Sequence, residues 1–142
     1  MLLIKAPVRY DSWGCGEFGA PRKSGDRRYQ HKGIDYAAQA GSVVISPVSG
    51  RVSRLGYCYA TEGPRAEYRL IEIIDELGAA VRFLYLRPIV EVGQNVSIGD
   101  EIGAVQDLSK IYTGIKNHCH IDIKYNGSFI DPERYLFANC NN

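Results

Sequence analysis

The amino-acid sequence predicts an all-β fold built from antiparallel strands. Short apolar runs recur between residues 42 and 125, and clusters of Gly, Pro, Asn, Asp and Ser separate them. No long stretch carries the 3.6-residue period of an amphipathic helix. The chain has 142 residues, 45% of them hydrophobic and 23% charged, which is enough for one globular domain with its own core. We therefore predict a single domain over residues 1–142.

The N-terminal segment is expected to be irregular. Residues 11–33 are rich in Gly, Arg, Ser and Pro and show no apolar periodicity. We therefore predict an irregular segment at residues 1–27, followed by a core at residues 28–137. The predicted strands, in chain order, are Ser42–Ser46, Gly50–Leu55, Tyr68–Ile74, Ala79–Leu86, Gln94–Val96, Glu101–Val105 and His118–Tyr125.

Three local patterns refine these elements. Arg69–Asp75 combines alternation with an apolar run, as expected for an interior strand covered on most of both faces. The following strand ends at Pro88, which has no N–H group for a β-ladder. Near the C-terminus, Asp131 followed by Pro132 is typical of a helix start, so the sequence predicts a short closing helical turn over Asp131–Phe137.

The charge of the chain favours no particular partner, because its formal net charge is only +1. The densest basic stretch, Arg22–Lys32, is compatible with nucleic-acid binding, but Ser24-Gly25-Asp26 interrupts it and it leads directly into a histidine motif. A solvated loop at the edge of a substrate cleft is the preferred interpretation, so no nucleic-acid partner is predicted. The ten tyrosines favour binding of an extended polymer only weakly, since tyrosine also forms strands readily.

The N-terminal apolar run and the cysteines bear on the cellular compartment. Leu2–Ile4 is too short for a signal-peptide core or a membrane span, so no export signal and no membrane span are predicted and the localisation stays open. Four cysteines at irregular spacing can form two disulfides, but reduced thiols are preferred for a chain without a secretion signal. These cysteines are Cys15, Cys58, Cys119 and Cys140.

The three histidines lie in two short clusters, His31-Lys32-Gly33-Ile34-Asp35 and His118-Cys119-His120. On a β-strand, the two imidazoles of the second cluster project to one face while the thiol points away. In the first cluster, a backbone turn at Gly33 is expected to bring His31 and Asp35 onto one ion. Such ligands suit zinc, although Mn, Co, Ni and Fe also accept them, and histidines with no metal role are the alternative. We predict a metal site whose fourth coordination position is left to water or substrate.

Taken in order, the motifs resemble those of the lysostaphin-type zinc metalloendopeptidases, a family of peptidoglycan endopeptidases. The resemblance covers roughly residues 28–137, and the closest members in pattern are those like leukocyte cell-derived chemotaxin 2. The family motifs are matched by His31 and Asp35, by Gly41–Val52, by a hairpin at Val90–Gly103, by His118 and His120, and by Asp131-Pro132 with Tyr135-Leu136. The chemotaxin-like features are Gly14-Cys15-Gly16, Tyr85 with Arg87-Pro88, and Tyr112–Ile115.

The resemblance implies a small antiparallel β-sheet core with a groove that holds one zinc ion. His31, Asp35 and His120 occupy the ligand positions of the family, and His118 occupies the position of a catalytic residue that is not a ligand. A second catalytic histidine of the family corresponds to Tyr85, and the chain has no further histidine for that role. A tyrosine is a poor base at neutral pH but can donate a hydrogen bond to an oxyanion.

Two hypotheses for function follow from the resemblance. In the first, the chain is a zinc-dependent endopeptidase that cuts peptides of bacterial cell-wall peptidoglycan, with His118 and Tyr85 as catalytic residues. In the second, it is a catalytically inactive, zinc-stabilised module that recognises the cell wall or a protein partner. Because no export signal is visible, a wall-directed domain is expected to be delivered by a phage tail or lysis system, with virion or assembly proteins as partners.

Overall fold

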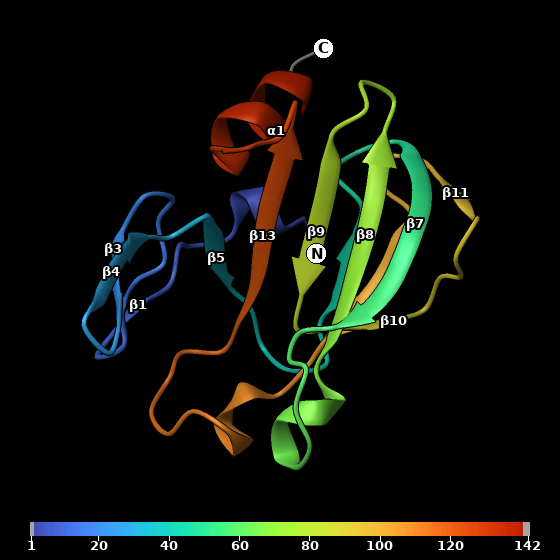
Figure 1. The fold of residues 1–142 in the computed structure, drawn as a ribbon. Helices are drawn as coiled ribbons and strands as arrows, with labels where there is room; N and C mark the ends of the chain where they lie inside the picture. Colours follow the sequence, from blue (N-terminus) through green and yellow to red (C-terminus); the bar gives the residue numbers. More distant parts are fainter. Residues whose placement is uncertain (1, 141–142) are drawn as a thin grey trace.

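Antiparallel β-strands make up most of the regular structure in the computed structural model, which describes residues 2–140 (Figure 1). The side chains of Ile4 and of residues 138–140 lie outside the described part, and with them the thiol of Cys140. These strands confirm the predicted all-β fold. Among the described residues, no helix is long and apolar enough to cross a membrane. The helices are η1 (Leu3–Lys5), η2 (Pro64–Glu67), η3 (Leu108–Lys110) and α1 (Pro132–Cys140).

The larger sheet has the strand order β11-β7-β8-β9-β13-β14, and β5 also pairs with β13. One edge of β13 pairs with β9, while its other edge pairs first with β5 and then with β14. Residues 120–122 of β13 therefore lie between β5 and β9. The strands are β5 (Gly33–Ala37), β7 (Gly50–Tyr57), β8 (Arg69–Asp75), β9 (Ala80–Leu84), β11 (Asn95–Val96), β13 (His118–Tyr125) and β14 (Ser128–Ile130).

A smaller sheet lies behind β7 and β8 in Figure 1, with the strand order β10-β12-β6. Its strands are β6 (Val43–Ile45), β10 (Leu86–Pro88) and β12 (Glu101–Val105). The sheets approach closely at Gly103, where a Cβ atom would lie 3.2 Å from Cδ1 of Ile71. The hydrophobic core fills the space between them and includes Val44, Val52, Ile71, Ile73, Val81, Phe83, Leu86, Ile102 and Ile121.

The predicted strand Ala79–Leu86 is divided in two at Tyr85. This residue has a φ of 69°, which lies in the left-handed region that is uncommon for residues other than glycine. Its backbone N–H donates to Arg69 O, and its carbonyl accepts from the N–H of Gln106. The chain therefore leaves the larger sheet at β9 and enters the smaller sheet at β10. Alternation of apolar residues carries no information about such a backbone angle, so the prediction of one continuous strand was wrong.

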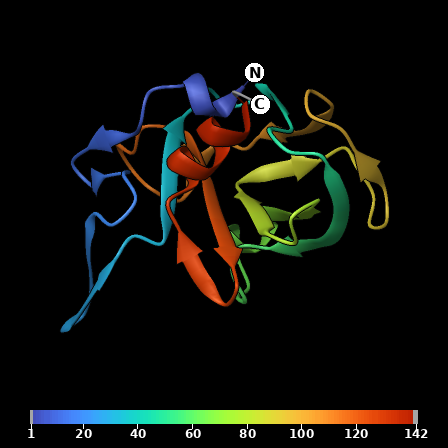
Figure 2. The same cartoon turned by 90° about the horizontal axis from the view of Figure 1, so that it is seen from above.

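The segment predicted to be irregular, residues 1–27, contains short hairpins instead. One joins β1 (Tyr10–Asp11) to β2 (Gly14–Cys15), and the other joins β3 (Pro21–Ser24) to β4 (Arg27–Gln30). The β3–β4 hairpin projects from the body of the molecule (Figure 2). Most of its side chains are exposed and many are charged, so it lacks the apolar alternation by which a strand is found in sequence.

The structure also contains two strands that were not predicted, β5 and β14, and a C-terminal helix that is longer than predicted. β5 was not predicted, because it is buried on both faces and Asp35 interrupts its apolar run. β14 follows a tight turn at Asn126 and Gly127, whose positive φ values of 50° and 82° are typical of a two-residue hairpin loop. The C-terminal helix begins as predicted, with Asp131 Oδ1 accepting from the N–H of Glu133 at 3.0 Å, and it extends to Cys140.

Candidate functional site

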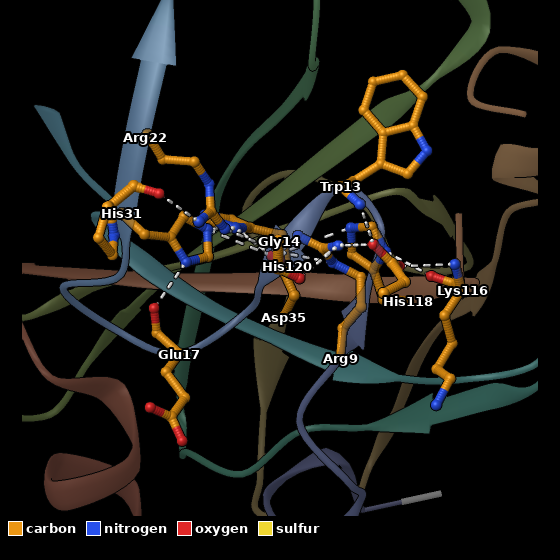
Figure 3. Close-up of polar contacts among 12 residues, drawn as sticks. Arg9, Trp13, Gly14, Glu17, Arg22, His31, Asp35, Lys116, His118 and His120 are labelled. Carbon is orange, nitrogen blue, oxygen red and sulfur yellow. Dashed lines mark hydrogen bonds and ion pairs between the residues drawn. The ribbon is translucent and has the colours of Figure 1, made fainter. Parts of the chain in front are cut away.

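The structure brings His31, Asp35 and His120 together. His120 and Asp35 are register partners on β13 and β5, and His31 lies in the link between β4 and β5. His31 Nε2 is 3.5 Å from Asp35 Oδ1 and 3.3 Å from His120 Nδ1, and Asp35 Oδ1 is 2.8 Å from His120 Nδ1. Figure 3 shows the three side chains converging from separate segments. Residues that are 89 positions apart in sequence thus present their nitrogen and oxygen atoms to one point.

These atoms fit a tetrahedral metal centre. Ligand bonds of about 2.0–2.2 Å place the ligand atoms of a zinc tetrahedron about 3.3–3.6 Å apart. Two of the three observed separations lie in this range, and the third is shorter by less than 1 Å. The three residues form a group of potential metal ligands whose donor atoms lie within 4.8 Å of one another. Two imidazoles and a carboxylate are also the type of donor set that zinc accepts, with one coordination position left open.

Neighbouring acceptors fix which nitrogen of each candidate ligand histidine could bind a metal ion. The Nδ1–H of His31 donates to the carbonyl of Glu17 at 3.0 Å, which leaves Nε2 with its lone pair. The Nε2–H of His120 donates to Asp122 Oδ2 at 3.1 Å, which leaves Nδ1. In each case the nitrogen that remains for a metal ion is the one that faces the other candidate ligands, and His120 Nδ1 must lose its proton to Asp35 or to solvent before it can bind. Such outer partners are the usual way in which proteins orient metal-binding imidazoles.

Asp122 is itself held by a forked ion pair. Arg82 Nε and Nη2 lie 2.7 Å and 2.8 Å from its two carboxylate oxygens. Burial by itself raises the pKa of Asp122, but hydrogen bonds from His120 and Arg82 outweigh burial and lower it. Asp122 therefore stays ionised and orients the His120 ring.

His120 carries a strongly raised pKa in the metal-free protein. Burial by itself lowers this pKa, but the hydrogen bonds to Asp122 and Asp35 outweigh burial and raise it to about 9. The imidazole is therefore held between two carboxylates that favour its protonated form. A metal ion must displace that proton in order to bind, since only the neutral imidazole is a ligand.

The second carboxylate oxygen of Asp35, Oδ2, pairs with arginine side chains. Arg9, which is only 4% exposed, donates from Nε to Asp35 Oδ2 at 3.2 Å and from Nη1 to Asp11 Oδ1 at 2.7 Å. Arg22 Nη2 approaches the same Asp35 oxygen at 3.8 Å. Burial raises the pKa of Asp35, but its interactions with the neighbouring imidazoles, first His120 and then His31, outweigh burial and hold the pKa well below its usual range. Asp35 is therefore a carboxylate whose Oδ1 is directed towards the histidines.

His118 lies beside this group and on the same face of β13, as the spacing predicted. Its side chain is buried, and Nδ1–H donates to the carbonyl of Lys116 at 2.9 Å. Nε2 therefore carries the lone pair, and it lies 3.9 Å from Asp35 Oδ1. Burial is the main cause that lowers the pKa of His118, so the ring is neutral at neutral pH. A neutral imidazole with a free nitrogen directed towards the ligand group can accept a proton there.

Tyr85 packs against His118 on the side of the β9–β10 junction. The two rings meet edge to face, with centroids 5.4 Å apart and planes at 89°. Burial raises the pKa of Tyr85 well above 10, so its hydroxyl stays protonated. The hydroxyl lies 3.0 Å from the hydroxyl of Tyr59.

The expected turn at Gly33 is absent, and this prediction was wrong. Gly33 lies in β5, opposite Asp122 in the ladder. A Cβ atom at Gly33 would lie 2.3 Å from the carbonyl of Ile121 and 2.7 Å from the His120 ring. Glycine is therefore needed there for the close approach of β13 and for the space that the His120 imidazole fills.

The sequence analysis did not identify the residues that hold the candidate ligands in place, which are Asp122, Arg82 and Arg9. Asp122 was detectable in principle, because it continues the alternation of His118 and His120 on one face of a strand. Arg82 lies opposite Asp122 in β9, so its role required the strand register. Arg9 lies in a segment without periodicity, and no sequence signal indicated it.

The three cysteine thiols that the structure describes take no part in the candidate site. Cys15, Cys58 and Cys119 are not bridged in the structure. Cys119 is fully buried on the opposite side of β13 from the two histidines, as expected for a residue between them on a strand. Burial raises the pKa of the Cys58 thiol to about 11, so this thiol stays protonated.

Comparison with known proteins identifies the family. Residues 29–132 match the family model described as peptidase family M23. Leukocyte cell-derived chemotaxin-2 from Mus musculus is 31% identical over 132 residues, which cover 89% of this chain and 76% of that protein. The antimicrobial peptidase lysostaphin from Staphylococcus simulans has a similar structure, with a TM-score of 0.71 at 22% identity over 96% of this chain and 52% of that one.

A further solved structure is also similar. It is a mutant of the catalytic domain of EnpA, a prophage-encoded M23 protein from Enterococcus faecalis, with a TM-score of 0.62 at 23% identity over 90% of each chain. The two solved structures support the fold, and the chain spans only about half of the lysostaphin chain. The family match covers most of the chain and agrees with the predicted lysostaphin-type motifs. This chain therefore belongs to peptidase family M23.

Proposed function

We propose that the chain is a zinc-dependent endopeptidase domain that cleaves peptides of bacterial peptidoglycan. One observation carries the proposal. The free nitrogen of His118 is directed towards the group formed by His31, Asp35 and His120, with Asp35 Oδ1 at 3.9 Å. A site that only stabilised the fold through a metal would not require a buried, neutral imidazole that is not a ligand.

The residues divide the chemistry of peptide hydrolysis between them. His31, Asp35 and His120 would hold the zinc ion, which supplies a Lewis acid for the peptide carbonyl and lowers the pKa of a bound water. His118 Nε2 accepts a proton from the attacking water and afterwards returns it to the leaving amine. The hydroxyl of Tyr85 donates a hydrogen bond to the oxyanion that develops on the carbonyl oxygen.

The tyrosine is suited to hydrogen-bond donation and not to proton removal. Its pKa is raised well above 10, mainly by burial, so the hydroxyl keeps its proton throughout the physiological range. A positioned proton-transfer group contributes about a hundredfold to ten-thousandfold to the rate. With Tyr85 as a donor only, turnover is expected to be slower than with a second histidine but still measurable.

A second candidate function is a catalytically inactive module that keeps the metal for stability and binds wall peptides or a protein partner. The observation that favours it is the contact between Tyr85 and Tyr59, whose hydroxyls lie 3.0 Å apart. If Tyr85 donates its hydroxyl proton to Tyr59, it has no proton left to donate to a substrate.

The proposed substrate is an extended wall peptide, and the proposed route to it is a phage tail or lysis system. Virion or assembly proteins are then the partners of the domain. The similarity to a prophage-encoded M23 protein supports this route.

The experiment that decides between the two functions uses the zinc-loaded protein. It is incubated with purified peptidoglycan and with defined cross-bridge peptides, in parallel with the variants His118→Ala and Tyr85→His. We expect slow cleavage by the wild type, none by His118→Ala and faster cleavage by Tyr85→His. If the wild type and Tyr85→His are both inert with zinc bound, the endopeptidase proposal is wrong. If only Tyr85→His cleaves, the inactive module is the correct function.

A further inference from the structure

Three tyrosine hydroxyls form a continuous chain next to His118. Tyr59 Oη lies 3.0 Å from Tyr85 Oη and 2.5 Å from Tyr112 Oη. Tyr59 belongs to the link between β7 and β8, and Tyr112 belongs to the link between β12 and β13. Figure 1 shows these two links side by side at one end of the molecule, beyond the junction of β9 and β10. We call Tyr59, Tyr85 and Tyr112 the hydroxyl relay.

The number of protons in the relay leaves one hydroxyl free to donate. Three hydroxyls carry three protons, and the two contacts between them use two. If Tyr112 donates a hydrogen bond to Tyr59 and Tyr59 donates one to Tyr85, then Tyr85 is only an acceptor within the relay. Its own proton is then available to a group outside the relay. If both hydrogen bonds have the opposite direction, Tyr85 donates its hydroxyl proton to Tyr59.

Arg65 favours the first direction. Its guanidinium carbon lies 5.6 Å from the ring centre of Tyr59 and 5.0 Å from that of Tyr112. A cation over an aromatic face is attracted to the π electrons, which makes the attached phenol a stronger donor and a weaker acceptor. Within the described residues, no cation lies over the ring of Tyr85. Tyr85 is therefore the best acceptor of the three hydroxyls.

The ring of Tyr85 is held chiefly by residues outside the relay, and its ring contact with Tyr59, with centroids 6.4 Å apart, would be kept in Tyr59→Phe. It packs edge to face against His118 on one side and against Tyr68 on another, with ring centres 5.4 Å and 6.2 Å away. Its backbone is bonded to Arg69 and Gln106. Only the direction of the O–H bond is left for Tyr59 to determine.

We propose that Tyr59 is a positioning residue, which donates to Tyr85 so that Tyr85 directs its own proton to the oxyanion of a bound peptide. The oxyanion part of this inference rests on the proposed endopeptidase function. The relay thus resolves the conflict that the Tyr59–Tyr85 contact poses for that function, because Tyr85 can accept from Tyr59 and donate to substrate at the same time.

The experiment compares Tyr59→Phe with the matched control Tyr57→Phe. Tyr57 lies two residues earlier, is 58% exposed and packs on Arg69, so its hydroxyl lies outside the relay. The first measurement is calorimetric binding of a phosphinate peptide, a tetrahedral anionic mimic of the oxyanion, to each zinc-loaded protein. The second is the kcat and KM of each protein on a cross-bridge peptide. A double variant with Tyr85→Phe completes a thermodynamic cycle.

The expected result is a loss of phosphinate affinity on the order of tenfold in Tyr59→Phe, the scale of effect that supporting hydrogen bonds have at metal sites. The kcat should fall by a similar factor with KM unchanged, and Tyr57→Phe should match the wild type. In the double variant, adding Tyr59→Phe to Tyr85→Phe should cause no further loss of phosphinate affinity or of kcat. Such coupling is not expected if Tyr59 merely supports the fold.

The outcomes separate this inference from the proposed function. If phosphinate affinity depends on Tyr59 but no peptide is cleaved, the relay is correct and the endopeptidase proposal is wrong. If the wild type cleaves peptide and Tyr59→Phe matches it in kcat and phosphinate affinity, the relay is wrong and the endopeptidase stands. A wild type that does not bind the phosphinate also overturns the relay.

Discussion

His120 and Asp35 face each other directly across the β13–β5 ladder, and their side chains meet with Nδ1 and Oδ1 2.8 Å apart. Directly opposed side chains of antiparallel strands lie close enough to interact. The register of the ladder therefore sets the distance between two candidate ligands. A slip of one residue would turn His120 to the opposite face of the sheet, so the register that forms the core also forms the site.

The first prediction concerns Asp122, which orients the His120 ring. We expect Asp122→Asn to weaken zinc affinity by about tenfold to a hundredfold, because the carboxylate that fixes the imidazole and raises its basicity is lost. Competition with a chromophoric chelator measures the affinity. The control is Asp26→Asn, which removes an exposed carboxylate from the β3–β4 turn. Equal affinities for the two variants would contradict the role of Asp122.

A second prediction follows from the pKa of His120. Since this pKa is raised to about 9, the imidazole of the metal-free protein is protonated at neutral pH. Zinc binding at about pH 7 should therefore release about one proton from His120, and the apparent affinity should fall further as the pH is lowered. Calorimetry in two buffers that differ in ionisation enthalpy measures the proton count. Binding near pH 7 with no proton release would show that His120 is already neutral.

The extent to which the site could be predicted varies from residue to residue. Alternation on a strand was enough to place His118 and His120 on one face, because the period of a strand is a local property. The position of His31 against His120 depends on how β4 leads into β5, and β5 itself was missed. Arg9 and Arg82 depend on pairing between distant segments, which local patterns do not encode. The left-handed backbone at Tyr85 likewise depends on its bonds to Arg69 and Gln106.

The third prediction concerns Gly33, which leaves room for the His120 ring. In Gly33→Ala the new Cβ would lie 2.3 Å from a backbone carbonyl, so the strands must separate. We expect a stability loss of about 1–3 kcal/mol, typical of overpacking, together with weaker zinc binding because the imidazole moves. Urea denaturation of the metal-free protein and a chelator assay measure the two effects.

The control for this variant is Gly56→Ala. There the new Cβ would meet the guanidinium of Arg54 at 2.9 Å, and a flexible side-chain end can move away. We expect its zinc affinity to match the wild type. If Gly33→Ala binds zinc as tightly as Gly56→Ala does, the ring does not depend on the space at Gly33.

The fourth prediction concerns Arg9, which joins Asp35 and Asp11 beneath the site. All three side chains are largely buried, so Arg9→Met would remove the arginine that pairs with both carboxylates and would leave Arg22, at 3.8 Å, as the arginine nearest to Asp35. Removing one partner of a buried ion pair costs about 3–5 kcal/mol, and we expect a destabilisation of this size in the metal-free protein. Zinc should recover part of the loss, because a divalent cation at Asp35 replaces the missing positive charge.

The control Arg28→Met removes an exposed charge from β4 and should change stability by about 0.5 kcal/mol or less. Urea denaturation with and without zinc measures both variants. A loss in Arg9→Met that is no larger than in Arg28→Met would show that the buried ion pairs of Arg9 do not stabilise the fold.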